Sequence, residues 1–386
     1  MPSRTFWRER VLPLRWLGAD RLFDEEKALK VASIVGARPQ FIKAAVVSGQ
    51  LRGRVQETLI HTGQHFDYDM SKRFFDELGI PKPDYNLGIS GGSHASMTAA
   101  MLVALEETLL KEKPDMVLLY GDTNTTLAGA LAAAKIHIPI AHVEAGYRTR
   151  SLTNPEEVNR VCADHVSSLL FAVTQQCLAN LREEGLEDRS QFVGDPMYDA
   201  FVRAREKACG MSHELVCFDG SVRDIPGDYY YLTCHREENT ADDNALREVL
   251  AAMDELDAPT VYPVHPRNRE RVLRLCGQRP YENVVFCDPV GYYTSIALVL
   301  GARKVVTDSG GLQREAFFAQ KKCVTVLPFV VIPETMVSGR NTLAAPQRDS
   351  IQEALSVEQH IDPEYQPFGD GHAGNRVVSS LLAFGG

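Results

Sequence analysis

Short apolar runs, each followed by a polar turn and a helical segment, recur along this chain. The run from Val117 to Gly121 is almost entirely apolar, and a second run spans Ile138–Val143. Apolar runs without alternation are typical of strands that are buried on both faces of a parallel sheet. The alanine- and leucine-rich segment Leu127–Lys135 between them is predicted to be a helix. Residues 117–148 are therefore expected to form a βαβ unit.

The same pattern begins near residue 30. Lys30–Val35 is predicted to be a strand that leads into a helix ending near Leu51, and Glu57–His61 is predicted to be the next strand. A helix is expected over Ser71–Leu78, followed by a loop over residues 79–87. Further along, four apolar residues with a four-residue spacing (Met97, Met101, Leu105 and Leu109) mark one face of a helix that we expect to pack in the core.

The second half repeats this organisation after a change in composition. Between Gly194 and Asp228 the chain is rich in glycine, proline and aspartate and has little periodicity, so we place the crossover between two domains there. The expected strands are Tyr229–Cys234, Thr260–Val264, Val284–Cys287 and Lys304–Thr307, and the expected helices cover Ala245–Leu256 and Ile296–Leu300. Two α/β halves that face each other would enclose a cleft, which is a common place for a ligand.

Size and composition limit the class of protein. The 386 residues suit two domains. An excess of acidic residues, 51 Asp and Glu against 41 Lys and Arg, disfavours a general nucleic-acid binder. The eight cysteines form no CxxC pair and no zinc spacing, and no window approaches a membrane span, so a reduced cytoplasmic protein is expected. Residues 1–29 contain arginine together with aromatic and leucine residues, and we predict no catalytic or binding role for them.

Carboxylates follow the two strands of the βαβ unit. Asp122 comes after the first strand and Glu144 ends the second, and ligands of parallel sheets bind at such strand ends. From spacing alone, an active site is about as well supported as the alternative, in which Asp122 is only a helix N-cap and Glu144 a surface loop residue. Pro155 marks the start of the next helix, where Glu156 suits the helix dipole by default, and Arg160 falls one turn later.

Cations and glycines at other strand ends indicate an anionic ligand. Arg38 and Lys43 lie near the start of the first helix, and Ser309–Gly311 precede a helix with free N–H groups. His61 and His65 are four residues apart, but Gly63 argues against a helix that would align them, so no metal site is expected. The chain has no nucleophile elbow and no GxGxxG after a strand. The residues alone thus indicate a two-domain protein that binds an anionic, nucleotide-linked ligand and has acid/base residues.

Several segments resemble one known family. The chain resembles the non-hydrolysing UDP-N-acetylglucosamine 2-epimerases in eight segments, which occur in the same order as in the family. They are GARPQFIK, HTGQHFD, YGDTNTTLAGALAAAK, HVEAGYR, NPEEVNR, HREEN, HPR and TDSGGLQREA. These segments extend from about Lys30 to Ala316. The forms GARPQF, GIPKPDYNL and YGDTNTT favour the branch that acts on UDP-2,3-diacetamido-2,3-dideoxy-glucuronic acid.

The resemblance implies a fold and a reaction. It implies two Rossmann-like domains of the GT-B type: an N-terminal domain over 30–190 that is completed by a C-terminal helix in 370–386, and a UDP-binding domain over 191–369. It also implies a cytoplasmic homodimer with a UDP-sugar substrate, no cofactor, and no nucleic-acid or membrane partner. The implied reaction is anti elimination of UDP to a 2-acetamidoglucal, followed by syn re-addition with C2 inverted.

Site residues are implied position by position. Asp122, Glu144 and Glu156 match the family's catalytic acids, and His235 matches its essential histidine. The substrate- and UDP-binding positions are matched by Arg38, Lys43, Arg160, His265, Ser309, Gly310, Gly311 and Glu315. Gln64, His65 and Arg236 match a second, regulatory UDP-sugar site of some members.

One segment departs from the family pattern. Residues 327–332 read Leu-Pro-Phe-Val-Val-Ile where the family has a loop with Arg, Asp, Thr and Glu. The departure leaves a catalytically altered UDP-sugar-binding homologue open, and a GT-B glycosyltransferase and a hydrolysing epimerase are further alternatives. Retention of the three carboxylates and His235 favours an active epimerase.

Overall fold

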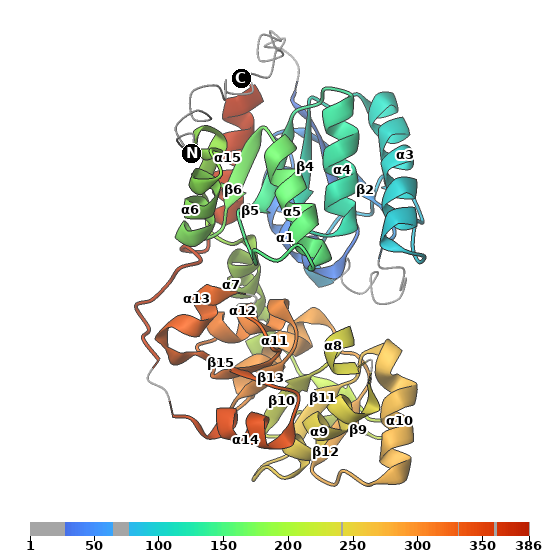
Figure 1. Ribbon diagram of the computed structural model, residues 1–386, viewed down its shortest axis with the longest axis vertical. Coiled ribbons are helices and arrows are strands. Elements are labelled where there is room, and N and C mark those ends of the chain that lie inside the picture. Colours follow the sequence, from blue (N-terminus) through green and yellow to red (C-terminus); the bar gives the residue numbers. More distant parts are fainter. Residues whose placement is uncertain (1–27, 65–76, 241, 331, 359–360, 386) are drawn as a thin grey trace, which may run out of the picture.

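The computed structural model describes residues 28–64, 77–240, 242–330, 332–358 and 361–385, which form two α/β domains (Figure 1). Each domain contains a parallel sheet with helices on its faces, so the prediction of two Rossmann-like domains is confirmed. No helix within these ranges is long and apolar enough to cross a lipid bilayer.

The first sheet has seven strands. Their spatial order is β3 (Tyr85–Asn86), β2 (Gln56–His61), β1 (Lys30–Val35), β4 (Met116–Tyr120), β5 (Ile140–Ala145), β6 (Leu169–Ala172) and β7 (Ser190–Phe192). Within the part of the chain that the structure describes, the helices of this domain include α1 (Arg38–Leu51), α3 (His94–Glu112), α4 (Asn124–Lys135), α5 (Pro155–Val166) and α6 (Gln175–Glu183). All residues of β4 are buried, as its uninterrupted apolar run predicts.

The second sheet has six strands. Their order is β12 (Val284–Cys287), β11 (Thr260–Pro263), β10 (Tyr230–Thr233), β13 (Val305–Thr307), β14 (Cys323–Val326) and β15 (Asn341–Ala344). Its helices are α8 (Glu237–Thr240), α9 (Asp243–Asp254), α10 (Arg269–Gln278), α11 (Tyr292–Gly301), α12 (Gly310–Phe318), α13 (Pro333–Met336) and α14 (Arg348–Ser356). A small hairpin, β8 (Glu214–Val216) and β9 (Val222–Asp224), precedes this sheet.

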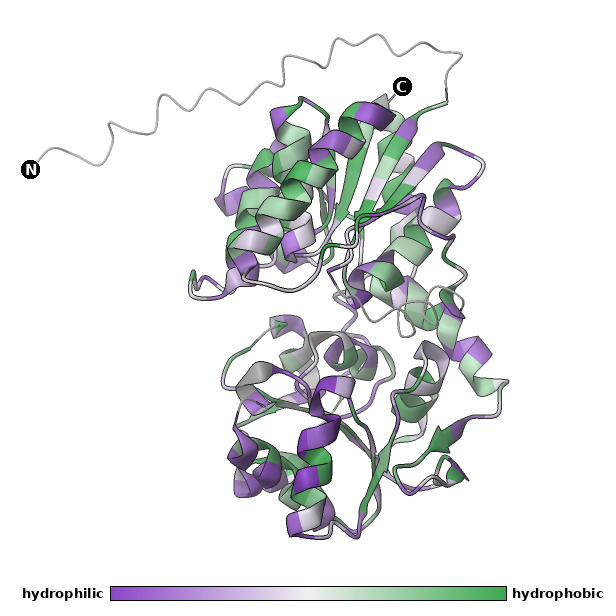
Figure 2. Cartoon of the chain, turned by 90° about the vertical axis from the view of Figure 1, so that its right-hand side faces the viewer, coloured by the Kyte–Doolittle hydropathy of each residue, from purple (hydrophilic) through white to green (hydrophobic). Residues whose placement is uncertain are grey.

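Two helices connect the domains. Helix α7 (Pro196–Cys209) lies between them in Figure 1, and its buried face joins residues of α1 to residues of α11 in one apolar cluster. Helix α15 (Ala373–Gly385), the last of the chain, returns to the N-terminal domain, where Val377, Val378 and Leu381 are buried with β1 and α1. Figure 2 shows the two lobes from the side, with apolar strands inside and polar residues on the outer helices.

Most predicted elements lie where the sequence places them. The predicted bounds of the strands Lys30–Val35 and Val284–Cys287 are confirmed, and Met101, Leu105 and Leu109 are buried in the core. Of the helix expected over Ser71–Leu78, only the last two residues are described, and both are helical.

Two predictions need correction. The expected loop over residues 79–87 contains the two-residue strand β3, which pairs with the end of β2. The crossover segment, which we expected to lack periodicity, contains the 14-residue helix α7. Three of its seven buried residues are alanines, at positions 200, 204 and 208, so the apolar residues have the spacing of a helix but give a weak hydrophobic signal.

Candidate active site

A cavity of about 470 Å³ lies between the two domains. The N-terminal domain contributes the first turn of α1 and Gln64, and the C-terminal domain contributes the ends of β10, β11 and β13. The cavity brings together seven of the residues that the sequence singles out: Arg38, Gln64, His235, His265, Ser309, Gly311 and Glu315. Because these residues lie far apart in the sequence and on both domains, the cavity is the first candidate for a ligand site.

Helix α12 begins at this cavity. Ser309 is its N-cap, and the Ser309 hydroxyl accepts a hydrogen bond from the Leu312 N–H at 3.4 Å. Gly310 and Gly311 are the first two residues of this nine-residue helix. Unpaired N–H groups and the positive end of the helix dipole favour an anion at this point.

A buried acid, Glu315, and a partly buried cation, Arg38, lie beside the helix start. Burial raises the pKa of Glu315 to about 7, against the opposing effect of the Arg38 guanidinium. Burial also lowers the pKa of Arg38, which Glu315 partly offsets. The pair therefore combines a permanent cation with a carboxyl group that titrates near neutrality.

His235 is held at the cavity by the end of β13. Asp308, whose side chain is fully buried, accepts hydrogen bonds from the backbone N–H of His235 at 2.8 Å and of Arg236 at 2.9 Å. The Nδ1 atom of His235 lies 3.4 Å from the same carboxylate, and its ring stacks on His265 at 5.7 Å between centroids. Burial lowers the pKa of His235, and Asp308 opposes this effect. A neutral imidazole at neutral pH can either accept or donate a proton.

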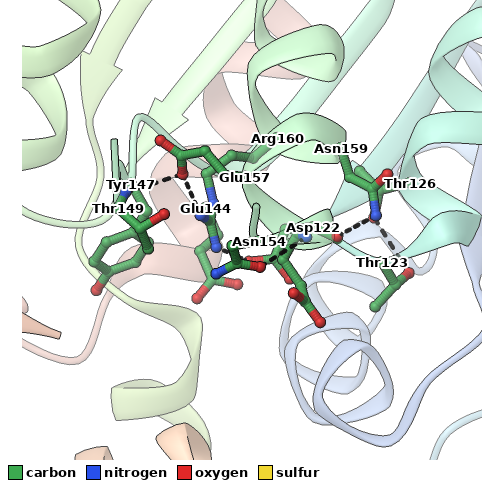
Figure 3. A network of polar contacts seen from close by, with 12 residues as sticks. Asp122, Thr123, Thr126, Glu144, Tyr147, Thr149, Asn154, Glu157, Asn159 and Arg160 are labelled. Atoms are coloured by element: carbon green, nitrogen blue, oxygen red, sulfur yellow. Dashed lines mark hydrogen bonds and ion pairs between the residues drawn. The ribbon is translucent and has the colours of Figure 1, made fainter. Parts of the chain in front are cut away.

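Asp122 lies directly after β4 and binds Arg160 of α5 (Figure 3). The N-cap of α4 is Thr123, so Asp122 does not cap this helix. Burial alone raises the pKa of Asp122, but the Arg160 guanidinium outweighs burial and the net effect lowers it. The carboxylate is one-third exposed and ionised at neutral pH, as a proton acceptor must be.

Glu144 has an unusual backbone conformation. Its φ is 74°, and a bulge interrupts the pairing of β5 with β6 between Val143 and Ala145. Non-glycine residues in this region are strained and often belong to functional sites. The carboxylate contacts the Lys43 ammonium and accepts a hydrogen bond from Arg314 at 2.7 Å.

Gly121 permits this arrangement. Its φ is 64°, and a Cβ atom at this position would lie 3.2 Å from Glu144 Oε2 and 3.6 Å from Lys43 Nζ. The backbone at Gly121 therefore lies so close to the Glu144 carboxylate that this position requires glycine.

His142 of β5 links the end of β4 to helix α5. It is fully buried, with Nε2 2.7 Å from the Gly121 carbonyl and Nδ1 2.7 Å from Asp164 of α5. Carbonyl and carboxylate oxygens only accept hydrogen bonds, so each ring nitrogen of His142 faces an acceptor atom. Asp164 also accepts from the Gly146 N–H at 3.0 Å and from Arg148 at 2.8 Å.

Glu156 and Glu157 differ in environment. Glu156 lies in the first turn of α5 and its side chain is exposed. Glu157 is buried and accepts hydrogen bonds from the Thr149 N–H at 2.9 Å and from Arg160 at 2.5 Å. Arg160 therefore pairs with Glu157 and Asp122, and not with Glu156 as its helical spacing suggested.

Several predicted residues lie outside the cavity lining. Lys43, Asp122, Glu144 and Arg160 form the polar network beside it, and Gly310 and Arg236 adjoin its C-terminal wall. His65 lies outside the described residues. His61 is described, its Nδ1 lies 3.3 Å from Asn86, and burial lowers its pKa. Within the described ranges no group of three or more metal-ligating side chains has the geometry of a metal site.

The sequence analysis missed three residues of the network. Asp308 and Arg314 are next to residues that it named, Ser309 and Glu315, and Glu157 adjoins Glu156. For Arg314 the sequence offered one local signal, a charged residue in a helix that also contains several apolar residues. That signal indicates a role only once the distant partners of Arg314 are known.

Within the apolar segment 327–332 the two end residues are buried, whereas Pro328, Phe329 and Val330 are exposed. None of the described residues of this segment lines the cavity. Leu327 is buried, and Ile332 joins Phe317 of α12 and Phe368 in a small apolar cluster against which Tyr147 packs. Next to it, Glu334 accepts a hydrogen bond from Thr174 of the N-terminal domain. This segment thus contributes to the contact between the domains.

Comparison with known proteins identifies a related family. A family model described as UDP-N-acetylglucosamine 2-epimerase matches residues 49–382. A Methanococcus maripaludis protein named UDP-N-acetylglucosamine 2-epimerase homolog is 43% identical, covering 92% of this chain and 99% of its own length. UDP-2,3-diacetamido-2,3-dideoxy-D-glucuronate 2-epimerase of Pseudomonas aeruginosa is also 43% identical, with the same coverage.

Solved structures show the same fold. The Methanocaldococcus jannaschii UDP-GlcNAc 2-epimerase, crystallised with UDP-GlcNAc and UDP, matches with a TM-score of 0.82 and 35% identity. The match covers 92% of this chain and 100% of that chain. The Neisseria meningitidis enzyme bound to UDP-GlcNAc matches with a TM-score of 0.79 and 27% identity, over 92% and 100% of the two chains.

Proposed function

This chain belongs to the UDP-N-acetylglucosamine 2-epimerase family, and on that premise we propose that it inverts C2 of a UDP-linked 2-acetamido sugar without hydrolysing it. The substrate is either the UDP-N-acetylglucosamine/UDP-N-acetylmannosamine pair or a 2,3-diacetamido uronic acid derivative. The observation that carries the proposal is a cavity with an anion-binding helix start on one domain and strand-end carboxylates on the other.

The C-terminal wall suits the UDP part. The N–H groups of Gly310 and Gly311, together with the Arg38 guanidinium from the opposite, N-terminal wall, offer hydrogen bonds and positive charge to a diphosphate. His235, beside them, has a lowered pKa that favours the neutral ring, which can donate a hydrogen bond to the departing phosphate oxygen. Glu315 has acceptor atoms for the hydroxyl groups of a ribose.

The carboxylates suit the sugar part. In the first step the bond from C1 to the phosphate oxygen breaks, its electron pair leaves with UDP, and a carboxylate removes the proton from C2, so that a C1–C2 double bond forms. In the second step UDP adds back to C1 and a proton returns to C2 on the opposite face. Anionic side chains stabilise the positive charge that develops at C1.

Two acid/base groups are needed because the proton leaves one face and returns to the other. Asp122, whose pKa is lowered, and Glu144, which contacts two cations, are both ionised at neutral pH. Glu156 is exposed near the same strand ends and is the third candidate.

A single experiment tests the proposal. The protein is incubated in heavy water with UDP-N-acetylglucosamine, UDP-N-acetylmannosamine and the UDP-linked diacetamido uronic acid, and the C2 proton is followed by NMR. We expect deuterium at C2 of the accepted substrate and an equilibrium mixture of the two epimers. The substrate with the largest kcat/KM identifies the branch.

Other outcomes identify other functions. Free 2-acetamido sugar with UDP would identify a hydrolysing epimerase, and UDP release that requires an added acceptor would identify a glycosyltransferase. UDP-sugar binding without exchange would identify a catalytically altered homologue, and each of these results would contradict the proposal.

The proposed assembly is a homodimer. Helix α3 exposes Val103 and Leu110, apolar side chains that are 57% and 53% exposed in the single chain. Light scattering of the purified protein should give twice the mass of one chain, and the mass of a single chain would contradict the proposed assembly.

A further inference from the structure

Arg314 connects three parts of the molecule. It lies on α12 of the C-terminal domain, and its side chain is 7% exposed. Its Nη1 atom donates to Glu144 Oε1 at 2.7 Å and to Asp195 Oδ2 at 2.8 Å. Glu144 ends β5 of the N-terminal domain, and Asp195 is the N-cap of α7, which lies between the domains. One guanidinium therefore bridges both domains and the segment that joins them.

The same helix forms the anion site. Ser309, Gly311, Leu312 and Glu315 from the start of α12 line the cavity, and Arg314 lies one turn from the helix start. A nine-residue helix moves as a rigid body, since its backbone hydrogen bonds fix its shape. A displacement of the helix start towards a bound diphosphate must therefore displace the Arg314 guanidinium relative to Glu144.

The Glu144 carboxylate depends on two cations from different domains. Lys43 contacts it from α1 of the N-terminal domain, and Arg314 contacts it from the C-terminal domain. Burial and the Arg314 guanidinium lower the pKa of Lys43 to about 7, whereas Asp195 and Asp122 oppose this. Loss of Arg314 from this position would leave two buried carboxylates near one ammonium, and the carboxylate and ammonium would rearrange.

Stability alone does not account for this arrangement. The Nε atom of Arg314 is buried and has no hydrogen-bond partner among the described residues, which is unfavourable for a charged donor. The backbone of Glu144 is strained at φ 74°. Unsatisfied polar groups and strain that occur together in a protein interior are a common feature of functional sites.

The surroundings of Arg314 favour strong electrostatic coupling. Phe317, on the next turn of α12, packs against Ile332 and Phe368, and the segment 327–332 contains no charged side chain. The side chains of Arg314 and Glu144 are only 7% and 9% exposed, so the attraction between them is weakly screened.

We propose that Arg314 is a positioning residue that couples closure of the two domains on the nucleotide to the placement of the Glu144 carboxylate. With the domains closed, Arg314 and Lys43 hold Glu144 as a carboxylate in one orientation, and domain opening removes one of the two cations. The inference rests on the proposed function, because it assigns Glu144 to proton transfer at C2.

The test compares Arg314→Gln and Arg314→Lys with the wild-type chain. Arg314→Gln removes the cation, whereas Arg314→Lys keeps a charge on a shorter side chain, which cannot place its nitrogen where the Nη1 atom contacts both Glu144 and Asp195. For both variants we expect kcat for C2 exchange to fall by about 10- to 1000-fold, while the dissociation constant for UDP changes by less than about threefold. An equal loss of UDP affinity, or an unchanged kcat in Arg314→Gln, would overturn the proposal.

A matched control separates positioning from folding. Arg340 is also buried, and it donates to the carbonyl oxygens of Phe317, at the end of α12, and of Asp362. Arg340→Gln should lower the melting temperature without lowering kcat at a temperature where it is folded. If Arg314→Gln does not fold, Arg314→Lys still provides the comparison of kcat with UDP affinity.

A double-mutant cycle provides the second readout. In a Glu144→Gln background, Arg314→Gln should reduce the remaining exchange by less than about threefold, because the group that it positions has been replaced. Full additivity of the two effects would overturn the inference while leaving the proposed function intact. Absence of exchange in the wild-type chain with every UDP-sugar would instead overturn the proposed function itself.

Discussion

At the scale of single residues, the site depends on carboxylates whose charge is fixed by named cations. Asp122 is ionised because Arg160 outweighs the effect of burial, and Glu144 is ionised because it contacts Lys43 and Arg314. The two acids come from neighbouring strands of one parallel sheet. Substitutions of these residues should therefore alter chemistry more than ligand affinity.

Asp122→Asn tests the role of the first acid. An amide cannot accept the C2 proton, so kcat for C2 exchange should fall by about 10²- to 10⁴-fold, with UDP affinity nearly unchanged. NMR in heavy water measures the exchange, and calorimetry measures UDP binding. Exchange at the wild-type rate would show that Asp122 is not catalytic.

Gly121→Ala tests the close approach beneath Glu144. The added methyl group would press on Glu144 Oε2 at 3.2 Å, so we expect kcat to fall at least tenfold and the free energy of unfolding to fall by about 2 kcal/mol. Gly79→Ala is the matched control, because Gly79 has nearly the same φ, 63°, with no atom within 4 Å of an added Cβ. It should cost about 1 kcal/mol of stability and leave kcat unchanged. Equal kcat values for the two variants would contradict this account.

At the scale of elements, the sequence predicts the strands and the order of the site segments. Apolar runs of four to six residues followed by a charged or glycine-containing turn specify β1, β4, β5 and β12 closely. Long-range pairing is not contained in such local patterns. The pairing of Arg314 with Glu144 spans 170 residues and depends on how the domains meet.

Local patterns do not show which of two neighbours with similar side chains is buried. The family resemblance directs attention to Glu156, yet the structure buries Glu157, because Arg160 and the backbone at Thr149 provide its partners. Helix α7 was missed since alanines form much of its buried face. In each case a contact made by folding, rather than residue type, decides the role.

Asp164→Asn tests the polar contacts that Asp164 of α5 makes with His142 of β5 and with Arg148. Burial alone raises the pKa of Asp164, but His142 and Arg148 outweigh it and the net effect lowers it. A lowered pKa means that the ionised carboxylate stabilises the fold above the pKa of the unfolded chain, about 3.9, and that this contribution disappears as the pH falls through the folded-state value.

We therefore expect Asp164→Asn to be about 3 kcal/mol less stable than wild type at pH 7 and pH 5, with a smaller difference below about pH 3.9. Urea denaturation at several pH values measures these differences. Asp188→Asn, at an exposed position, should change stability by less than about 0.5 kcal/mol at any of them. A difference for Asp164→Asn that grows on acidification would contradict the assigned charge.

At the scale of the whole molecule, both domains contribute to the cavity, and each domain also depends on chain segments from outside its own sheet. Helix α15 completes the core of the N-terminal domain after the chain has passed through the C-terminal domain. Its buried residues should therefore influence the stability of a domain that begins more than 300 residues earlier in the sequence.

Leu381→Ala tests this dependence. Leu381 is fully buried among residues of the N-terminal core, so its truncation should cost about 2–5 kcal/mol of unfolding free energy for that domain. Phe384→Ala is the control on the same helix, because Phe384 is 39% exposed, and it should cost under about 1 kcal/mol. Calorimetry distinguishes the two, and equal losses would contradict the role assigned to α15.

The return of α15 also has a consequence for biosynthesis. Domains usually fold during translation in the order in which they emerge from the ribosome. In this chain the second sheet and its helices are complete at Ser356, whereas the first domain still lacks Val377, Val378 and Leu381. We therefore expect the C-terminal domain to reach its native state before the N-terminal domain, so that the candidate site forms only after α15 has been synthesised and has packed against the first domain.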